Sequence, residues 1–458
     1  MLPTDIFLRP TFVLISINRI MMNKNILGTL LVFAFGSVPF FAQDTIFISK
    51  NDIIQKVANY SLQIKVAEKS YQAARADYRQ SNAVFLPNIN VSHTGISTTN
   101  PLMAFGSKLN QEILATTDFN PALLNNPKAT QNFATKIEVQ QPLLNLDGLY
   151  QRQAAKAKVA AFELQTERTK EYLELETAKA YMQLQLAYKA VKVLEKANTT
   201  AQENLKMVES YFKNGMLQKT DLLNTQVRVN EITNQLHYAK SNLQNASDYL
   251  AFMWNEDNTG KIYKPTEELD NFITVEKNIA TFSDARKDIQ AMQKSTEAYE
   301  KMFQSSRFGF LPRFNAFGSY ELYDQNIFRT SAKGYVVGAQ LLWNVFDGFK
   351  TIGKTQKAKA DYEKATIETE QYKKQSQLEL NKTNRQLIDA EHKVNLSKLA
   401  FEQSQEAYRI RQNRFIQGLE KTTDLLMAET QMAQKELEHL QAIFDYNFTK
   451  QYLQFLTK

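Results

Sequence analysis

Two long stretches of the chain carry apolar residues at helical spacing with almost no interruption. They run from 147 to 213 and from 347 to 417. Residues that alternate three and four positions apart form the seam of helices that pack along one another. At 1.5 Å per residue each stretch would form a helix of roughly 100 Å. The seam positions are Leu173, Thr177, Ala180, Leu184, Ala187, Val191, Leu194, Asn198, Ala201, Leu205, Val208 and Phe212 in the first, and Leu380, Leu387, Val394, Phe401, Tyr408 and Phe415 in the second.

Shorter helices are expected on both sides of each long one. Helices at 52–83 and 283–306 each come before a pair of strands. Helices at 220–253 and 423–456 each follow a long helix and must fold back along it. Gly215 and Gly418 are expected just past the ends of the long helices, because glycine tolerates the left-handed backbone found there. Thr220 and Thr423 are expected as N-caps of the returning helices. Asp221 and Asp424 then fall in the first turn, where the helix dipole favours a carboxylate.

Four short segments alternate between apolar and polar residues, which predicts strands at about 86–98, 132–142, 311–323 and 333–344. One side carries aromatic and aliphatic residues and the other carries Lys, Glu, Gln and Asn, as in a lipid-facing barrel with a wet lumen. A soluble pair of hairpins half-buried on helices is the alternative. Four strands cannot close a barrel, and open edges in lipid leave backbone groups unpaired. The barrel interpretation therefore requires several chains. The connections at 107–131 and 324–332 are polar and are expected to be loops.

The same order of elements occurs twice, with matching residues. Phe85-Leu86-Pro87 recurs as Phe310-Leu311-Pro312, at an offset of 225 positions, and the stretch from Phe212 recurs from Phe415, at an offset of 203. The pattern predicts two tandem repeats, 43–254 and 283–458, joined by a connector at 255–282. The difference of 22 positions indicates an insertion in the first repeat, between Pro87 and Phe212.

The N-terminal 42 residues are expected to be a leader. A secretory signal peptide at about 22–42 has a basic start at Lys24 and an apolar core that ends before Pro39. A membrane anchor is less favoured, because the apolar run is too short. Translation from Met1 and from Met21 or Met22 both remain open.

Composition excludes several classes of protein. The chain has no cysteine, so disulfides, thiolate metal sites and a lipid-modified cysteine are excluded. The net charge is +7, of which residues 43–458 carry +5; this surplus is spread along helices that are also rich in Glu, so nucleic-acid binding is not indicated. The four histidines are dispersed without metal-site spacing, and no catalytic motif or cofactor site is found. They are His93, His237, His392 and His439.

The layout resembles the TolC family of outer-membrane efflux channels over essentially all of residues 43–458. The matching signatures lie at the strand ends and helix tips. They are the two Phe-Leu-Pro motifs, Gln141-Pro142-Leu143-Leu144, Trp343-Asn344-Val345-Phe346-Asp347-Gly348, Arg286-Lys287-Asp288-Ile289, Tyr211-Phe212-Lys213-Asn214-Gly215 and Arg414-Phe415-Ile416-Gln417-Gly418.

The resemblance implies a mainly α fold with a small β part. Three identical chains would share a twelve-stranded transmembrane barrel, four strands each, above a long α-helical barrel. The chain would be a passive, trimeric exit duct of a tripartite efflux or type I secretion system. It would lie in outer-membrane lipid with its helices in the periplasm, and would work with a periplasmic adaptor and an inner-membrane pump or transporter. The substrate, whether drug, metal ion or protein, stays open.

The resemblance also implies roles for individual positions. The gate would involve Phe212, Thr220, Asp221, Phe415, Glu420, Thr423 and Asp424. The adaptor-binding tips would be Asn214, Gly215, Met216, Gln417, Gly418 and Leu419. The barrel–helix transitions would be Pro87, Pro142, Pro312, Trp343, Asp347 and Gly348.

This chain departs from the family pattern near the gate. Met427 stands where a second acidic ring would lie, and Glu420 stands where a basic residue may follow the tip glycine. We therefore expect a less acidic gate with different closing contacts. The alternative function is a secreted or periplasmic coiled-coil interaction protein, or the adaptor itself, which would leave the duplicated strand pairs without a use.

Overall fold

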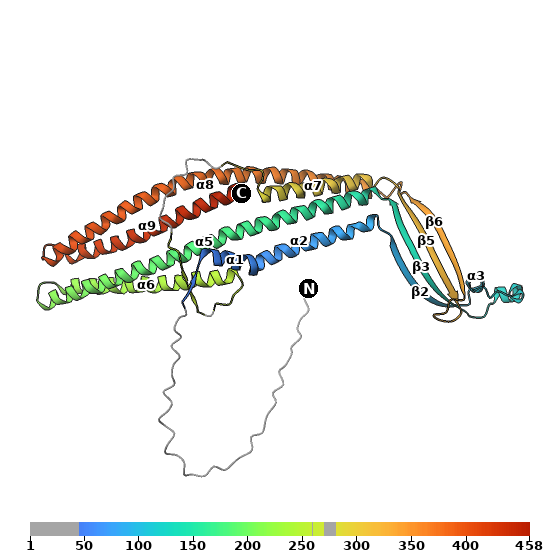
Figure 1. Ribbon diagram of the computed structural model, residues 1–458, viewed down its shortest axis with the longest axis horizontal. Coiled ribbons are helices and arrows are strands. Elements are labelled where there is room, and N and C mark those ends of the chain that lie inside the picture. Colours follow the sequence, from blue (N-terminus) through green and yellow to red (C-terminus); the bar gives the residue numbers. More distant parts are fainter. Residues whose placement is uncertain (1–44, 259, 270–280) are drawn as a thin grey trace, which may run out of the picture. The chain divides into compact units, whose positions relative to one another are not determined.

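The computed structural model describes residues 45–258, 260–269 and 281–458 (Figure 1). The expected leader and residues 270–280 of the expected connector lie outside these ranges. In what is described, two similar runs of helices and strands follow one another, and the fold is mainly helical with a small sheet part. This agrees with the fold class expected from the sequence.

The first repeat begins with a short strand, β1 (Thr45–Ile48), which pairs in parallel with β4 (Ile262–Pro265). The single helix expected at 52–83 is wrong. It is divided into α1 (Lys50–Tyr60), α2 (Leu62–Gln80) and the 3-10 turn η1 (Ser81–Val84). Ser61 separates the first two because its ψ of 127° is not helical. The long helix α5 (Leu146–Lys213) follows the first strand pair, and α6 (Lys219–Met253) returns along it.

The second repeat has the same plan with α7 (Lys287–Phe308), α8 (Lys350–Ile416) and α9 (Thr422–Thr457). The expected start of the second long helix at Asp347 is wrong by three residues. Gly348 and Phe349 both have φ of +67°, a left-handed backbone that a helix cannot continue. The Asp347 carboxylate instead accepts a hydrogen bond from the Thr351 backbone N–H at 2.9 Å, inside the first turn of α8.

The predicted seams of the long helices are confirmed as packing positions. α5 packs against α6, α7 and α9, and α8 packs against α7 and α9. Most seam side chains are buried and the others are half-buried. The buried ones are Leu173, Thr177, Ala180, Leu184, Val191, Leu194, Ala201, Val208, Leu380, Val394, Tyr408 and Phe415. Burial of these side chains between helices drives the pairing.

The remaining strands form one antiparallel sheet in the order β2-β3-β5-β6. They are β2 (Asn88–Thr98), β3 (Thr130–Leu144), β5 (Arg313–Asp324) and β6 (Ala332–Leu342). Within the described chain, β2 and β6 each pair on one side only. The sheet therefore has two open edges, one from each repeat.

The register gives the sheet two chemically different faces. Ile89, Val139, Gly318 and Val337 lie in one row, and Val91, Ile137, Tyr320 and Tyr335 lie in the next row of the same face. We call this the apolar face. The opposite face, called the polar face, carries Asn88, Asn90, Lys136, Glu138, Ser319 and Glu321. On it, the Lys136 ammonium is 3.2 Å from Glu138 and 3.7 Å from Glu321.

The segment between β2 and β3 is folded, so the expected loop at 107–131 is wrong. It contains α3 (Pro101–Asn110), the 3-10 turn η2 (Thr116–Phe119) and α4 (Pro121–Asn125). The side chains of Asn100 and Asn120 accept hydrogen bonds from the first turns of α3 and α4. Among the described residues, no helix has the length and apolar character to cross a membrane.

Candidate functional site

Each long helix ends in the same glycine turn. Gly215 has φ of +75° and Gly418 has φ of +74°. The N–H of Met216 donates to the Tyr211 carbonyl at 2.9 Å, and the N–H of Leu419 donates to the Arg414 carbonyl at 2.9 Å. These are the bonds that end a helix around a left-handed residue. The expectation for the two glycines is confirmed.

The N-caps expected at Thr220 and Thr423 are wrong. α6 begins at Lys219 after the N-cap Gln218, and α9 begins at Thr422 after the N-cap Lys421. The two threonines are therefore second residues of their helices. At the start of α6 the capping bond is made by a residue inside the helix: the Asp221 carboxylate accepts a hydrogen bond from the N–H of the N-cap residue Gln218 at 3.1 Å. Each N-cap thus lies two residues earlier than expected, and the helices begin at 219 and 422 instead of 220 and 423.

The two turns, called the hairpin tips, leave the expected adaptor-binding residues in solvent. Met216 is 71% exposed and Leu419 is 64% exposed. Asn214, Gly215, Gln417 and Gly418 are exposed as well. The tips therefore carry one solvent-exposed apolar side chain each, beside the glycine turn.

Phe212 and Phe415, the two phenylalanines near the tips, differ in burial and in packing. Phe212 is half-buried, whereas Phe415 is only 2% exposed and packs with Val208, Leu425 and other residues of all four helices. The Tyr211 ring lies 5.8 Å from that of Phe415, and its hydroxyl donates to the Ile416 carbonyl at 3.2 Å. Phe415 therefore joins the two hairpins as a packing residue.

Four charged residues form an ion cluster at the second tip, which we call the tip cluster. The Glu420 carboxylate lies 3.0 Å from Arg411 and 2.9 Å from Arg414, and its side chain is only 12% exposed. Arg411 also lies 3.8 Å from Asp424. The cluster holds the last turns of α8 to the start of α9. Arg411 was missed in the sequence and Arg414 was noted only within a family signature, although Arg414 occupies the last turn of α8, where a basic residue is favoured.

A buried polar network lies about three helical turns from the tips and joins all four helices of the two hairpins. Asn204 donates to Glu429 at 2.6 Å, and Arg228 lies 3.5 Å from the same carboxylate. Asn204 also donates to the Tyr408 hydroxyl at 3.4 Å. Glu429 is fully buried, and this burial raises its pKa although Asn204 and Arg228 act in the opposite direction. The network was missed because Asn204, Arg228 and Glu429 lie outside the predicted seams; only Tyr408 belongs to one.

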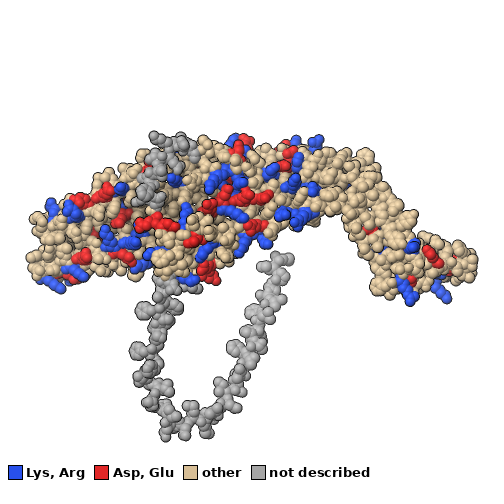
Figure 2. Space-filling view, in the orientation of Figure 1, with Lys and Arg blue, Asp and Glu red and all other residues tan. Residues whose placement is uncertain are grey.

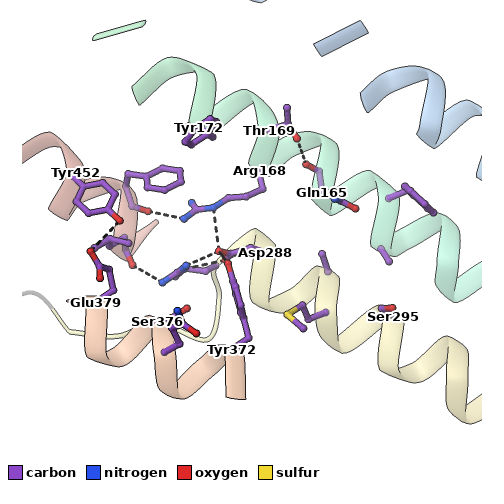
Figure 3. Close-up of a pocket in the computed structure, with 18 of the residues that line it drawn as sticks. Gln165, Arg168, Thr169, Tyr172, Asp288, Ser295, Tyr372, Ser376, Glu379 and Tyr452 are labelled. Atoms are coloured by element: carbon purple, nitrogen blue, oxygen red, sulfur yellow. Dashed lines mark hydrogen bonds and ion pairs between the residues drawn. The ribbon is translucent and has the colours of Figure 1, made fainter. Parts of the chain in front are cut away.

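A third cluster fastens the C-terminal helix to the rest of the chain (Figure 3). Asp288 accepts hydrogen bonds from Arg286 at 2.6 Å and from Tyr372 at 2.7 Å, and Arg168 lies 3.5 Å away. The same two arginines donate to the carbonyls of Phe455 and Leu456 at the end of α9. Burial alone would raise the pKa of Asp288, but the bonds from Arg286 and Tyr372 and the charge of Arg168 lower it on balance.

This cluster lies in an open pocket of about 920 Å³. Its arginines have their hydrogen-bond partners within the chain, so its geometry indicates a structural fastening. It also gives a role to Arg286 and Asp288, which the sequence indicated only as a family signature.

The expected barrel–helix transitions contain several specific contacts. The Trp343 indole N–H donates to the Phe310 carbonyl at 3.1 Å. Arg313, directly after Pro312, forms two hydrogen bonds with Asp147 at the start of α5. Gln141, directly before Pro142, donates to the Phe85 carbonyl at 2.8 Å. The contact between Arg313 and Asp147 therefore joins a strand of the second repeat to the long helix of the first. In the described part of the chain, no group of acidic or histidine residues is arranged to hold a metal ion.

Charge is unevenly distributed over the surface. On the face shown in Figure 2, Lys, Arg, Asp and Glu are interspersed along the helices, few occur over the strands, and more follow at the 101–128 segment. The apolar face of the sheet includes Val337 at 74% and Tyr335 at 75% exposure. Such a surface is unusual for a protein that contacts only water.

The fold agrees with that of solved outer-membrane proteins, two of them described as channels. The CmeC outer membrane channel of Campylobacter jejuni has a TM-score of 0.76 at 15% identity, covering 89% of this chain and 85% of that one. VceC of Vibrio cholerae has a TM-score of 0.75 at 16% identity, with 89% and 96% covered. The MtrE channel of Neisseria gonorrhoeae has a TM-score of 0.73 at 15% identity, with 89% and 88% covered.

No curated protein matches the sequence. The model of the outer membrane efflux protein family matches residues 53–256 and 281–457, which include all the long helices and all four strands of the larger sheet. The chain therefore belongs to the outer membrane efflux protein family.

Proposed function

We propose that the chain forms the outer-membrane exit duct of a tripartite efflux or type I secretion system. The observation that carries this proposal is a four-stranded sheet with one exposed apolar face and two open edges, joined to long helical hairpins. In lipid, the backbone groups on those edges need partners, and identical chains can supply them. Membership of an efflux-channel family agrees with this arrangement.

Three copies would complete the barrel. The β6 edge of one copy would pair with the β2 edge of the next, which gives twelve strands in a closed, symmetric ring. The apolar face would then contact lipid, and the polar face with Lys136, Glu138 and Glu321 would line the lumen. The helices would continue the duct into the periplasm. Transport would be passive, with an inner-membrane pump or transporter as the source of energy.

The hairpin tips would form the gate and the docking surface for the periplasmic adaptor. Met216 and Leu419 offer apolar side chains to such a partner. Three copies of Asp424 would form a ring of negative charge in which cations concentrate. In each copy Arg411 lies near Asp424, and its positive charge would reduce the net negative charge of the ring. Glu420 would keep the second tip closed through its two arginines.

Cell fractionation tests the function directly. We expect the protein in outer-membrane extracts as a trimer that dissociates on heating, and we expect the purified trimer to conduct ions across planar bilayers. A water-soluble monomer without channel activity would instead support a coiled-coil interaction protein.

Ion selectivity tests the gate. Asp424→Ala should reduce the preference for cations in reversal-potential measurements, because it removes a charge from each copy in the ring. Glu406→Gln is a matched control, since it removes an exposed carboxylate that pairs with Arg409 on α8. Equal selectivity of Asp424→Ala and the unmodified channel would reject the assignment of Asp424.

A further inference from the structure

The folded segment at 101–128 covers one particular face of the sheet. α3 contacts β3 and β6. Thr130, Asn132 and Ala332 are buried at that end, whereas the exposed neighbours Gln131 and Lys333 belong to the other face. By register, the three buried residues lie on the polar face, in line with Lys136, Glu138 and Glu321. At the strand ends, the segment therefore packs against the last row of the polar face.

Specific contacts hold α3 in this position. Gln111, 2% exposed, donates to the Gln131 carbonyl at 2.8 Å and to the Asn132 side chain at 2.7 Å. Together with Ala104 and Ser107, which are also buried, Gln111 marks the side of α3 that faces the sheet. Because the Asn132 side chain is on the polar face, these bonds fix α3 on that side.

The segment also has internal contacts that make it a folded unit. Lys108 of α3 forms an ion pair with Asp118 of η2 at 2.7 Å. The rings of Phe105 and Phe119 lie 5.8 Å apart in an edge-to-face arrangement. Their neighbours from α3 and α4 line a small pocket of about 260 Å³. The segment can therefore keep its position without another protein.

The opposite side of α3 is apolar and has no cover. Leu102 is 81% exposed and Leu109 is 54% exposed. Gly106 lies between them, and no residue that the structure describes is within 4 Å of where its Cβ would be. Positions four and three apart fall on one side of a helix. This side points away from the sheet, because Ala104, Ser107 and Gln111 occupy the other.

We propose that three copies of α3 meet on the axis of the duct and form a plug in its outer mouth. This inference rests on the proposed trimeric barrel. In that barrel the polar face lines the lumen, and the segment lies at the strand ends farthest from the long helices. Leu102, Gly106 and Leu109 of each copy would pack against the same residues of the other two.

The dimensions agree with a plug. Twelve strands about 4.8 Å apart and tilted by about 40° close into a barrel about 24 Å across, measured between backbones. Three parallel helices, each about 10 Å wide, fill a circle about 22 Å across. Glycine at the middle of the stripe allows close approach of the helix backbones. Three copies of α3 are therefore nearly as wide as the barrel, and at the strand ends, beyond the side chains of the lumen, they would cover the mouth.

Cysteine cross-linking tests the position of α3, and the natural chain has no cysteine to interfere. Equivalent residues of three copies approach one another only near the axis. Leu102→Cys should therefore form covalent dimers with a short bismaleimide in native membranes, since each copy supplies one thiol and each linker joins two. Lys333→Cys is the matched control, because it lies at the same end of the sheet but on the apolar face, and it should stay monomeric under denaturing conditions.

A second variant tests the effect on conduction. Replacing residues 101–128 with a short Gly-Ser linker should raise single-channel conductance about twofold or more, since pore width limits ion flow. A trimer in which Leu102→Cys does not cross-link, or in which the linker variant conducts like the unmodified channel, overturns the plug. Absence of any trimer or channel is a different outcome, which rejects the proposed function and the plug with it.

Discussion

A single carboxylate, Glu429, is buried between the two helical hairpins. Its burial raises its pKa above that of an unfolded Glu, so its contribution to stability is fully present at acidic pH and is lost as pH rises through the folded-state pKa. At neutral pH the folded chain must either keep this group protonated or bury its charge. The hydrogen bonds from Asn204 and the charge of Arg228 offset only part of the cost.

Glu429→Gln is therefore expected to unfold at a higher temperature than the unmodified protein at pH 7. The advantage should shrink as pH falls toward 4.5, by about 1.4 kcal/mol for each unit by which the pKa is raised. Thermal unfolding followed by circular dichroism in detergent measures the difference. Glu231→Gln is the control, because Glu231 is 58% exposed, and pairs of this kind contribute little. A less stable Glu429→Gln protein at pH 7 would contradict the role of burial.

At the scale of the element, the hairpin tips depend on backbone conformation. Gly418→Ala should destabilise the second hairpin by about 1 kcal/mol, because alanine is strained at a φ of +74°. Gly353→Ala is the opposite case: this glycine lies in α8 with nothing near its missing Cβ, and alanine favours a helix by up to about 1 kcal/mol. Unfolding temperatures of the two variants should therefore change in opposite directions. If both variants changed the unfolding temperature in the same direction, the role assigned to the left-handed backbone at Gly418 would be wrong.

Elements with a strong repeated pattern could be predicted from the sequence, and those fixed by a few local contacts could not. The seams through Leu184 and Leu380 are predictable because burial repeats over many turns. The break at Ser61 and the starts of α6 and α9 depend on single backbone angles and caps. The helix α3 was missed because it is short and half-polar, and a sheet residue, Asn132, helps to hold it through Gln111.

The candidate site shows the same division. The tip glycines were found from their duplication, whereas Arg411 of the tip cluster and the network around Glu429 were missed. Charged residues on long helices are mostly solvated, so nothing in the sequence distinguishes Arg228, which is buried, from the exposed residues around it. Arg228 and Asn204 become partners of Glu429 only when α5, α6, α8 and α9 pack together.

At the scale of the whole molecule, the two faces of the sheet are expected to have different surroundings, with lipid on one side and water on the other. Val337 lies on the apolar face and its neighbour Val336 lies on the polar face. In the proposed barrel, Val337→Arg would place a charge in lipid, at a cost of about 2–4 kcal/mol near the middle of the bilayer. Val336→Arg would place the same charge in the wet lumen, in the row of Glu138.

We therefore expect Val337→Arg, but not Val336→Arg, to reduce the amount of trimer in the outer membrane. Quantitative immunoblots of membrane fractions compare the two variants. Equal amounts of both would indicate that the two faces have the same surroundings, as in a soluble protein.

The two open edges of the sheet also have a genetic consequence. In the proposed trimer, each copy would offer β6 to one neighbour and take β2 from another, so a ring would close only when every member has intact edges. In a cell that makes normal and edge-defective copies in equal amounts, random mixing leaves only about one ring in eight free of a defective member. Alleles that damage an edge strand should therefore be dominant, whereas alleles that prevent the chain from being made should be recessive.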